Sequence, residues 1–486
     1  MISDDDRREP FLSPAGIELV KLLLEKTGIS LQPLEESAQM SDSGPIPLTF
    51  GQERLLFLDQ LFPRSSSYNI PVALLLSGSL NLHALSSSLD LILLRHSALR
   101  SAFSSSPSSS SSSSSCSISS LSHLPFSFFD LSSLSVSLDS ALAVASHLAG
   151  RPFDLSRPPL LRVALLKINP HLHLLLLTVH HIVCDGWSVS LILDDLSSLY
   201  SCLCQGYPSS LHPLPVTFSE FASHQRASLS SPALQNLARF WSSALVPLPP
   251  RLDLPADRPR PARPSFLASR LWLTLPDQLS ARVLALSRRH QVTPFMLLLA
   301  AFQLLLWRYS GSSHFLLGTV AANRHHQKLD RVVGFFANTL ALNCDLTGDP
   351  TVAELLARVC KVTLGAFEHQ DYPFEKVVEQ LQPQRASSRQ PLFDVMFVMQ
   401  NATIGEVGMC GLEVKEVEVE SLGAKCDLLM EVRQATGGQM KVMVEYSREI
   451  YEQHRARRML ANYEQVLSEV VAHPLSRISD LPAFQD

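Results

Sequence analysis

The pattern of apolar and polar residues changes most sharply between residues 171 and 200. The run Leu172–Val179 is short, almost wholly apolar and ends in β-branched residues, which favours a buried strand. A polar stretch follows it, and apolar residues then recur at the spacing of one helical face between residues 189 and 199. Ser188 stands where a helix-capping side chain is expected. The sequence therefore predicts a strand, a tight polar turn and a helix.

Similar patterns predict helices and strands in both halves of the chain. They favour strands at 72–76 and 315–320 and helices at 80–94, 138–148, 276–290, 294–309 and 451–471. The second half repeats the general plan of the first without visible sequence identity. Because 486 residues exceed what one ordinary hydrophobic core holds, we expect two lobes of comparable size.

Two segments depart from this pattern. Residues 1–42 combine one short amphipathic helix with a polar, proline-punctuated linker, and they predict an appendage. A nearly pure serine run predicts a disordered surface insertion over 104–120, because serine buries too little apolar area to offset its ordering entropy. The predicted lobes are an N-terminal one at 43–225 and a C-terminal one at 226–486.

The composition narrows the choice of partners. The net charge is −5, charged residues make up 17% of the chain, and no basic block is interleaved with aromatic residues, so nucleic acid is not expected. The eight cysteines form no matched CxxC pairs, which predicts reduced thiols. An acidic start and the lack of a membrane-length apolar run predict a soluble, cytoplasmic protein with small-molecule or protein partners and no membrane.

The polar turn after the predicted strand contains the candidate chemistry. A strand end holds a histidine rigidly, Gly186 permits close approach of a ligand, and the free amides of a helix start favour developing negative charge. A histidine there could act as a general base. Most histidines beside apolar strands are structural, however, and the spacing leaves two possibilities for Asp185. It either pairs with His181 or points away and binds an arginine.

The complete turn resembles a known motif. Residues His180, His181, Asp185 and Gly186 form HHxxxDG, which arises by chance on the order of a few times per thousand chains of this length. The motif is similar to that of an acyltransferase superfamily. Its members include chloramphenicol acetyltransferase, dihydrolipoyl acyltransferases, wax ester synthases, plant acyltransferases and nonribosomal peptide synthetase condensation domains.

Six further segments select one member of that superfamily. In chain order they resemble condensation-domain motifs at 47–58, 95–103, 217–222, 333–340, 369–375 and 388–397. Ser97 replaces a usual glutamate, Phe218 lacks a usual hydroxyl, Glu220 replaces an aspartate, and Gln390 departs from the seventh motif. The chain has no DFGWG segment and no room for a lipoyl domain. It therefore resembles a condensation domain, of the kind that joins two L-configured residues.

This resemblance implies an α/β fold with two chloramphenicol-acetyltransferase-like lobes arranged as a V-shaped pseudo-dimer. The implied activity is that of an amide-bond-forming acyltransferase. In this reaction the α-amine of an acceptor aminoacyl thioester attacks the carbonyl of a donor aminoacyl or peptidyl thioester. Both substrates would ride on the phosphopantetheine of donor and acceptor peptidyl carrier proteins, with an adenylation domain adjacent. The domain itself would need no metal and would bind no cofactor. Two alternatives are an acyltransferase acting on a free small acceptor and a catalytically inactive scaffold.

The resemblance also implies a role for each residue of the turn. Neighbouring side chains at a strand end point to opposite faces, so His181 would face the substrate tunnel while His180 points into the core and holds the turn. Gly186 would let the substrate arm pass and present a backbone amide. Asp185 would form a structural ion pair, with Arg324 or otherwise with Arg54. The remaining residues expected along the tunnel are Trp187, Ser188 and Asn338.

Overall fold

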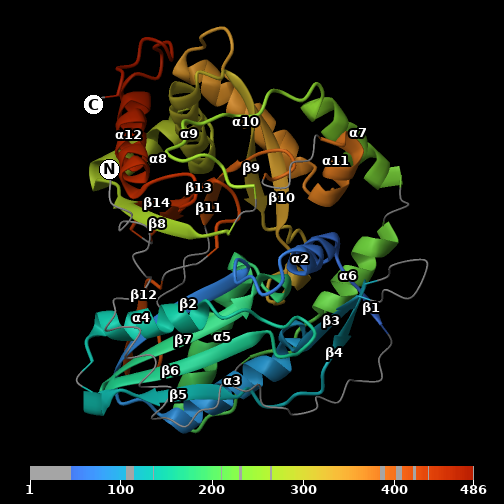
Figure 1. Ribbon diagram of the computed structural model, residues 1–486, viewed down its shortest axis with the longest axis vertical. Coiled ribbons are helices and arrows are strands. Elements are labelled where there is room, and N and C mark those ends of the chain that lie inside the picture. The colour runs from blue at the N-terminus through green and yellow to red at the C-terminus, as the bar shows by residue number, and fades with distance from the viewer. Residues whose placement is uncertain are drawn as a thin grey trace, which may run out of the picture.

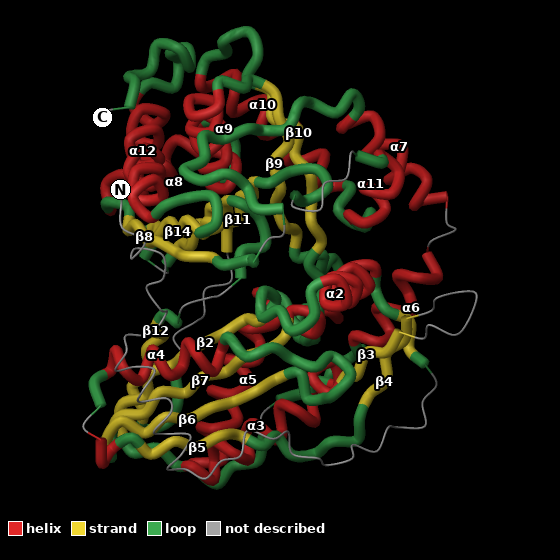
Figure 2. The backbone as a smooth tube through the Cα atoms, in the orientation of Figure 1, coloured by secondary structure: helices red, strands yellow, loops and turns green. Residues whose placement is uncertain are grey.

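The computed structural model describes residues 45–105, 114–134, 136–209, 211–228, 232–262, 265–383, 389–400, 408–419, 423–435 and 437–484. Its helices and strands gather into two lobes, one above the other in Figure 1. The predicted appendage at 1–42 lies outside the described residues. The predicted α/β class is confirmed, since each lobe combines a sheet with helices (Figure 2).

The lower lobe is built on a sheet in the order β12-β2-β7-β6-β5. Its strands are β2 (Asn69–Gly78), β5 (Phe126–Asp130), β6 (Leu161–Asn169), β7 (Leu172–His180) and β12 (Leu412–Val417). Its helices are α3 (Leu82–Arg95), α4 (Leu138–Ala149) and α5 (Gly186–Cys204). Leu175 and Leu177 of β7 share a core with α3 and α5, whereas Leu174 and Leu176 share one with α4. The strand is apolar throughout because both of its faces are buried.

A small three-stranded sheet, β1-β4-β3, lies beside this lobe. Its strands are β1 (Ile46–Pro47), β3 (Ser101–Ser105) and β4 (Ser114–Ile118), with β3 and β4 paired antiparallel. The prediction of disorder over 104–120 is therefore wrong for the described residues at both ends of the run. Backbone hydrogen bonding within the sheet orders these serines, although their side chains contribute little apolar burial. Residues 106–113 lie outside the described residues.

The upper lobe contains a sheet in the order β10-β9-β11-β13-β14-β8. Its strands are β8 (Ala268–Thr274), β9 (His314–Ala321), β10 (Asn338–Asp345), β11 (Val395–Gln400), β13 (Leu428–Gln434) and β14 (Met440–Ser447). One large core joins it to helices α8 (Asp277–Arg289), α9 (Pro294–Ser310), α10 (Val352–Glu368) and α12 (Gln453–Ala472). Helices α7 (Pro232–Leu245) and α11 (Phe374–Leu381) pack on the same core, whereas α6 (Phe218–Ala227) lies against β1 and the core of the lower lobe.

Two elements connect the lobes. Helix α2 (Phe50–Leu61) belongs to the first half but lies beside the upper lobe in Figure 1, and it contacts α11. Strand β12 belongs to the second half but pairs antiparallel with β2, placing Leu412 opposite Gly78 and Val417 opposite Ala73. One strand of the predicted C-terminal lobe thus belongs to the N-terminal sheet. The V-shaped pseudo-dimer and the lobe limits remain predictions.

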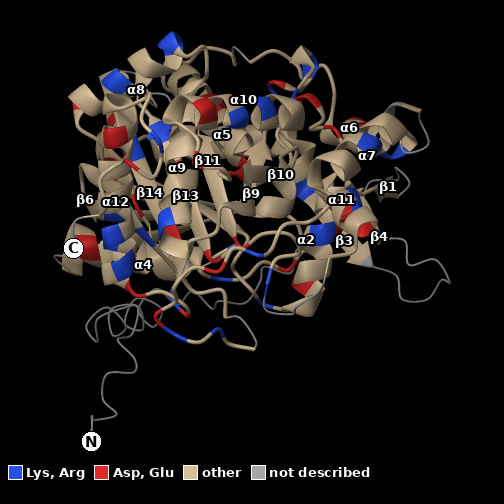
Figure 3. Cartoon of the chain, turned by 90° about the horizontal axis from the view of Figure 1, so that it is seen from above, with Lys and Arg blue, Asp and Glu red and all other residues tan. Residues whose placement is uncertain are grey.

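The surface charges bear on the expectation that nucleic acid is not a partner, and the helices bear on the expectation that no segment spans a membrane. Basic and acidic residues are interspersed in the view of Figure 3. Within the described ranges, no helix taken singly has the length and apolarity to cross a membrane, and only the pair α8 and α9, bent by 108°, passes on length and composition. Most of α9 is buried in the core of the upper lobe.

Candidate active site

The strand, turn and helix predicted around the histidine pair are present. β7 runs between β2 and β6, a one-turn 3-10 helix follows at His181–Val183, and α5 begins at Gly186. The backbone amide of His181 donates to the Tyr68 carbonyl at 2.8 Å, which fixes the turn to the lower sheet. Asp185 caps α5 by accepting a 2.8 Å hydrogen bond from the Ser188 amide. The prediction of Ser188 as the cap is therefore wrong, because the cap is Asp185, three residues earlier.

His180 lies in the interior of the lower lobe. Its side chain is 3% exposed, and its Nδ1 accepts a hydrogen bond from the Ile182 amide at 3.2 Å. The ring of Phe153 packs edge-on against it with centroids 5.9 Å apart. Burial, with the charges of Arg162 and Lys425, lowers the pKa of His180 to about 3. The imidazole is therefore neutral near pH 7 and holds the turn.

His181 lies between the lobes. Its ring meets Phe335 of the upper half at 4.9 Å between centroids and Tyr68 of the lower lobe at 6.5 Å. Its Nδ1 has no hydrogen-bond partner of normal geometry among the described residues. Burial first, and then the charge of Lys425, lowers the pKa of His181 well below its usual value. A neutral imidazole in this position can accept a hydrogen bond from a substrate.

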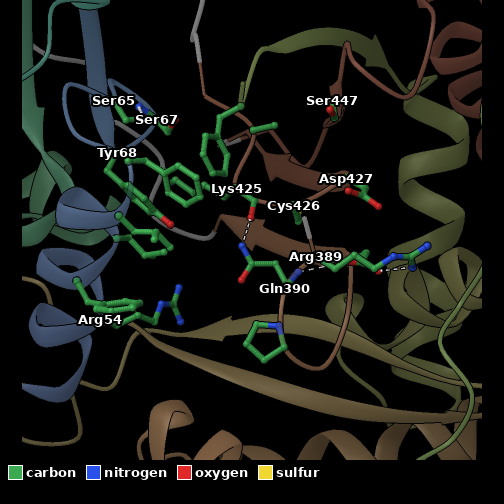
Figure 4. Close-up of a pocket in the computed structure, with 18 of the residues that line it drawn as sticks. Arg54, Ser65, Ser67, Tyr68, Arg389, Gln390, Lys425, Cys426, Asp427 and Ser447 are labelled. Carbon is green, nitrogen blue, oxygen red and sulfur yellow. Dashed lines mark hydrogen bonds and ion pairs between the residues drawn. The ribbon is translucent and has the colours of Figure 1, made fainter. Parts of the chain in front are cut away.

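Two large cavities flank the histidine pair. One, of about 720 Å³, is lined by His180 and extends along α2 (Figure 4). The other, of about 700 Å³, is lined by His181, Asp185 and Gly186. Seven residues from both lobes line both cavities: Arg54, Ser67, Tyr68, Phe374, Gln390, Lys425 and Cys426. The cavities therefore meet at one shared wall beside the histidines.

Asp185 binds residues of the second half of the chain. Its Oδ1 lies 3.4 Å from an Arg324 guanidinium nitrogen, and its Oδ2 accepts from the amides of Phe336 and Ala337 at 3.1 and 3.2 Å. These partners and the helix cap occupy both carboxylate oxygens, and no hydrogen bond joins Asp185 to His181. Of the two possibilities left by the sequence, the structure has the arginine pair.

The other candidate arginine has a different partner. Arg54 lies 3.5 Å from Glu375 and stacks 5.7 Å from the ring of Phe374. It therefore takes no part in binding Asp185, and instead contributes to the wall shared by the two cavities.

Gly186 is close to the upper sheet. A Cβ atom there would lie 2.6 Å from Nε2 of Gln400, at the end of β11. The glycine is not in the left-handed backbone region, so close approach rather than backbone strain explains the missing side chain. Nothing in the local pattern pointed to Gln400 or Tyr68 as neighbours of the turn, since each is distant from it in the chain.

The three residues expected along a tunnel make hydrogen bonds within the protein. Trp187 is 39% exposed and donates to the Asp330 carbonyl at 3.0 Å, while Ser188 is buried and donates to the Gly334 carbonyl at 2.9 Å. Asn338 donates to two carbonyls and accepts from the Phe374 amide at 3.1 Å. None of the three lines either large cavity, whereas Asn338 lines a small third one of about 20 Å³ beside Arg54 and Phe335, so their place along a substrate tunnel stays a prediction. Their side chains hold the lobes and loops together.

The arrangement of possible metal-binding side chains was predicted to hold no metal ion. Among the residues that the structure describes, no group of three or more His, Cys, Asp or Glu side chains is arranged to hold a metal ion.

Two α/β lobes, a histidine at a strand end between them and two adjoining cavities fit the HHxxxDG acyltransferase class that the sequence motifs resemble. The condensation domain family matches residues 42–486, and the chain belongs to that family. The resemblance predicted from the motifs, and with it the expectation of an amide-bond-forming enzyme, is confirmed at the level of the family.

Relatives agree with this assignment. A component of the linear gramicidin synthase of Brevibacillus parabrevis is 37% identical over 468 residues, which are 95% of this chain and 9% of that protein. Malpinin synthetase of Mortierella alpina is 39% identical over 409 residues, which are 83% of this chain and 5% of that protein. The chain thus spans less than a tenth of the length of either relative.

Two solved structures show the same fold. The X-domain from teicoplanin biosynthesis superposes with a TM-score of 0.81 at 24% identity, over 92% of this chain and 99% of that one. The first condensation domain of the calcium-dependent antibiotic synthetase superposes with a TM-score of 0.77 at 18% identity, over 91% and 100%.

Proposed function

We propose that the chain joins two thioester substrates by an amide bond. A donor aminoacyl or peptidyl thioester and an acceptor aminoacyl thioester would each enter on the phosphopantetheine arm of a carrier protein. The observation that carries this proposal is the pair of cavities, about 720 and 700 Å³, that share one wall beside His181. A reaction between two bound substrates needs two such spaces meeting at one point.

The reaction conserves every atom of the two substrates. The lone pair of the acceptor amine attacks the donor thioester carbonyl, the carbonyl electrons move to oxygen, and collapse of this intermediate expels a thiolate. The proton lost by nitrogen ends on the departing sulfur. The neutral imidazole of His181 accepts a hydrogen bond from the amine, orients its lone pair and receives its proton in transit. Because the pKa of His181 is well below its usual value, positioning outweighs basicity.

The length of the relatives supports a multidomain setting. We infer that the partners are a donor and an acceptor peptidyl carrier protein, with an adenylation domain in the same assembly. In this scheme the phosphopantetheine belongs to the carriers, the condensation domain binds no cofactor of its own, and the assembly is cytoplasmic. His181 and Gly186 would be its catalytic residues, with His180, Asp185, Arg324 and Arg54 supporting them.

Mass spectrometry of carrier-bound products tests this proposal. Purified chain is mixed with one carrier loaded with a donor and one loaded with an acceptor, and the acceptor carrier should gain the mass of the donor acyl group. His181→Ala should lower the single-turnover rate by at least about a hundredfold, as expected for loss of a residue that handles the proton. His83→Ala, which alters an exposed histidine on α3, is the matched control and should retain the parental rate. Transfer to free amines but not to the carrier-bound acceptor would contradict the proposal.

A further inference from the structure

Lys425 lies where the two cavities meet, and it lines both of them. The segment that carries it is held firmly: Nε2 of Gln390 donates to the Lys425 carbonyl at 2.7 Å (Figure 4). Two residues earlier, Gly423 packs so tightly that a Cβ atom there would lie 2.2 Å from Cα of Ser67 in the lower lobe. The lysine is therefore fixed against both lobes at the shared wall.

The acidic side chains around the ammonium group of Lys425 have other partners. Its two nearest acidic neighbours are already paired, Glu445 with Arg270 at 2.7 Å and Glu431 with Arg433 at 2.6 Å. Among the residues that the structure describes, none makes a hydrogen bond or ion pair with this ammonium. Cations shielded from bulk water are normally paired, so an unpaired one that faces a cavity has a binding or catalytic use there.

We propose that Lys425 is a catalytic residue, whose ammonium stabilises the negative charge that develops on the donor carbonyl oxygen. This inference rests on the proposed amide-forming function. In that reaction the electrons of the carbonyl move onto oxygen as the amine attacks, and the oxyanion forms where the two substrates meet. A cation at the wall shared by the two cavities stabilises the transition state more than the neutral thioester, because the negative charge is present only in the former.

The local electrostatics agree with this role. After burial, Lys425 exerts the strongest lowering effect on the pKa of His181, which keeps the imidazole neutral and able to accept a hydrogen bond. The same positive charge disfavours a protonated acceptor amine. One cation thus favours the nucleophilic form of the amine and the oxyanion together.

The charge of Lys425 itself depends on pH. Burial lowers the pKa of this lysine from 10.5 to about 8, and Glu445 acts in the opposite direction. The charged or titratable groups that face it are Glu445 of β14, Glu431 of β13, Arg270 of β8, His180 at the end of β7, His181 after it, Arg54 of α2, Tyr68 before β2 and the neighbouring Cys426. Lys425 is therefore mostly charged at pH 7 and loses that charge as the pH rises above 8.

Two substitutions separate charge from structure. Lys425→Met removes the cation at similar length, and Lys425→Arg keeps a cation that does not titrate. With saturating loaded carriers, Lys425→Met should lower the single-turnover rate by about 10²–10³-fold, the usual cost of losing one oxyanion donor. Lys425→Arg should stay within about tenfold of the parent. Lys361→Met, an exposed lysine on α10, changes net charge equally and should leave the rate unchanged.

The pH profile and the unfolding midpoint supply readouts that a structural lysine would not move. The parental rate should decline above about pH 8, and this decline should be absent in Lys425→Arg. Urea unfolding should show Lys425→Met as stable as the parent or more so, because an unpaired, desolvated cation has been removed. A lower unfolding midpoint for Lys425→Met, or the same alkaline decline in Lys425→Arg, would overturn the inference.

The outcomes also distinguish the two proposals. Product from the parent together with a parental rate in Lys425→Met overturns the role of this lysine and leaves the proposed function standing. No product from the parent with any loaded carrier pair overturns the proposed function, and the role of Lys425 falls with it.

Discussion

Asp185 and Arg324 are 139 positions apart in the chain, come from different lobes, and meet at 3.4 Å beside the turn that carries His181. Both side chains are almost fully buried. The pair therefore ties the upper lobe to the first turn of α5, and it leaves the imidazole of His181 without a carboxylate partner from this motif. The motif aspartate acts on the shape of the site rather than on the proton chemistry of the histidine.

Removing the Asp185 carboxylate should lower the free energy of unfolding before it lowers the rate of the reaction. Asp185→Ala leaves a buried arginine unpaired and removes the cap of α5, so we expect a loss of about 3–5 kcal/mol in the free energy of unfolding. Urea denaturation followed by circular dichroism measures it. The matched control is Asp194→Ala, which breaks a half-exposed pair with Arg331 and should cost about 1 kcal/mol or less. Parental stability in Asp185→Ala would contradict a structural role.

The buried His180 should make stability depend on pH. Its folded pKa is about 3 against a usual 6.5, so below pH 6.5 the unfolded chain binds a proton that the folded chain does not. The free energy of unfolding should therefore fall by about 1.4 kcal/mol per pH unit from this group between roughly pH 6 and pH 4. Urea titrations at several pH values measure the slope. His180→Gln should reduce this slope by about 1.4 kcal/mol per pH unit, the contribution of one proton. An unchanged slope would show that His180 is already charged in the folded chain.

The contact of Gly186 with Gln400 predicts how the site tolerates a side chain. Gly186→Ala should fold normally, because the flexible end of Gln400 can move by the amount that a Cβ requires. Gly186→Leu would place a branched side chain in the cavity of His181 and should lower the single-turnover rate by at least about tenfold through misplacement of the substrate. Parental turnover in Gly186→Leu, at parental stability, would show that substrates do not pass this position.

We expect the serine run to tolerate shortening only between β3 and β4, without loss of stability. Ser104 and Ser115 are hydrogen-bonded side chain to side chain at 3.1 Å in the β3–β4 pair, so the replacement must leave them in place. Exchanging residues 106–113 for a short Gly-Ser linker should change the free energy of unfolding by about 1 kcal/mol or less, because loop-closure entropy varies slowly with length. Thermal melting compares the two chains, and a large drop would assign this segment a packing or binding role.

Local pattern was enough to predict the centre of the fold. The strand at β7 and the long helices α9 and α12 were found because their apolar residues are numerous and periodic, and the structure places them within about two residues of the predicted limits. The capping residue of α5 was missed because Asp185 and Ser188 are both good caps, and contacts from the upper lobe decide between them.

The walls of the cavities could not be predicted in this way. Gln400 is the polar last residue of the apolar strand β11, and Lys425 stands three residues before β13, so no local pattern shows which distant residues meet them at the cavities. Trp187, Ser188 and Asn338 line neither large cavity although each stands in or beside a motif. Nearness to a motif in the chain does not decide which side of a helix or strand end faces a cavity.

Strand β12 has a consequence for any attempt to divide this protein. Because Leu412–Val417 completes the lower sheet from the second half of the chain, a fragment ending near residue 225 would expose the backbone edge of β2 over Ala73–Gly78. Such an open edge invites pairing with a second molecule. Two separately expressed halves would then fail to behave as independent folding units. They should aggregate alone and regain solubility when produced together, as complementing fragments of one structure.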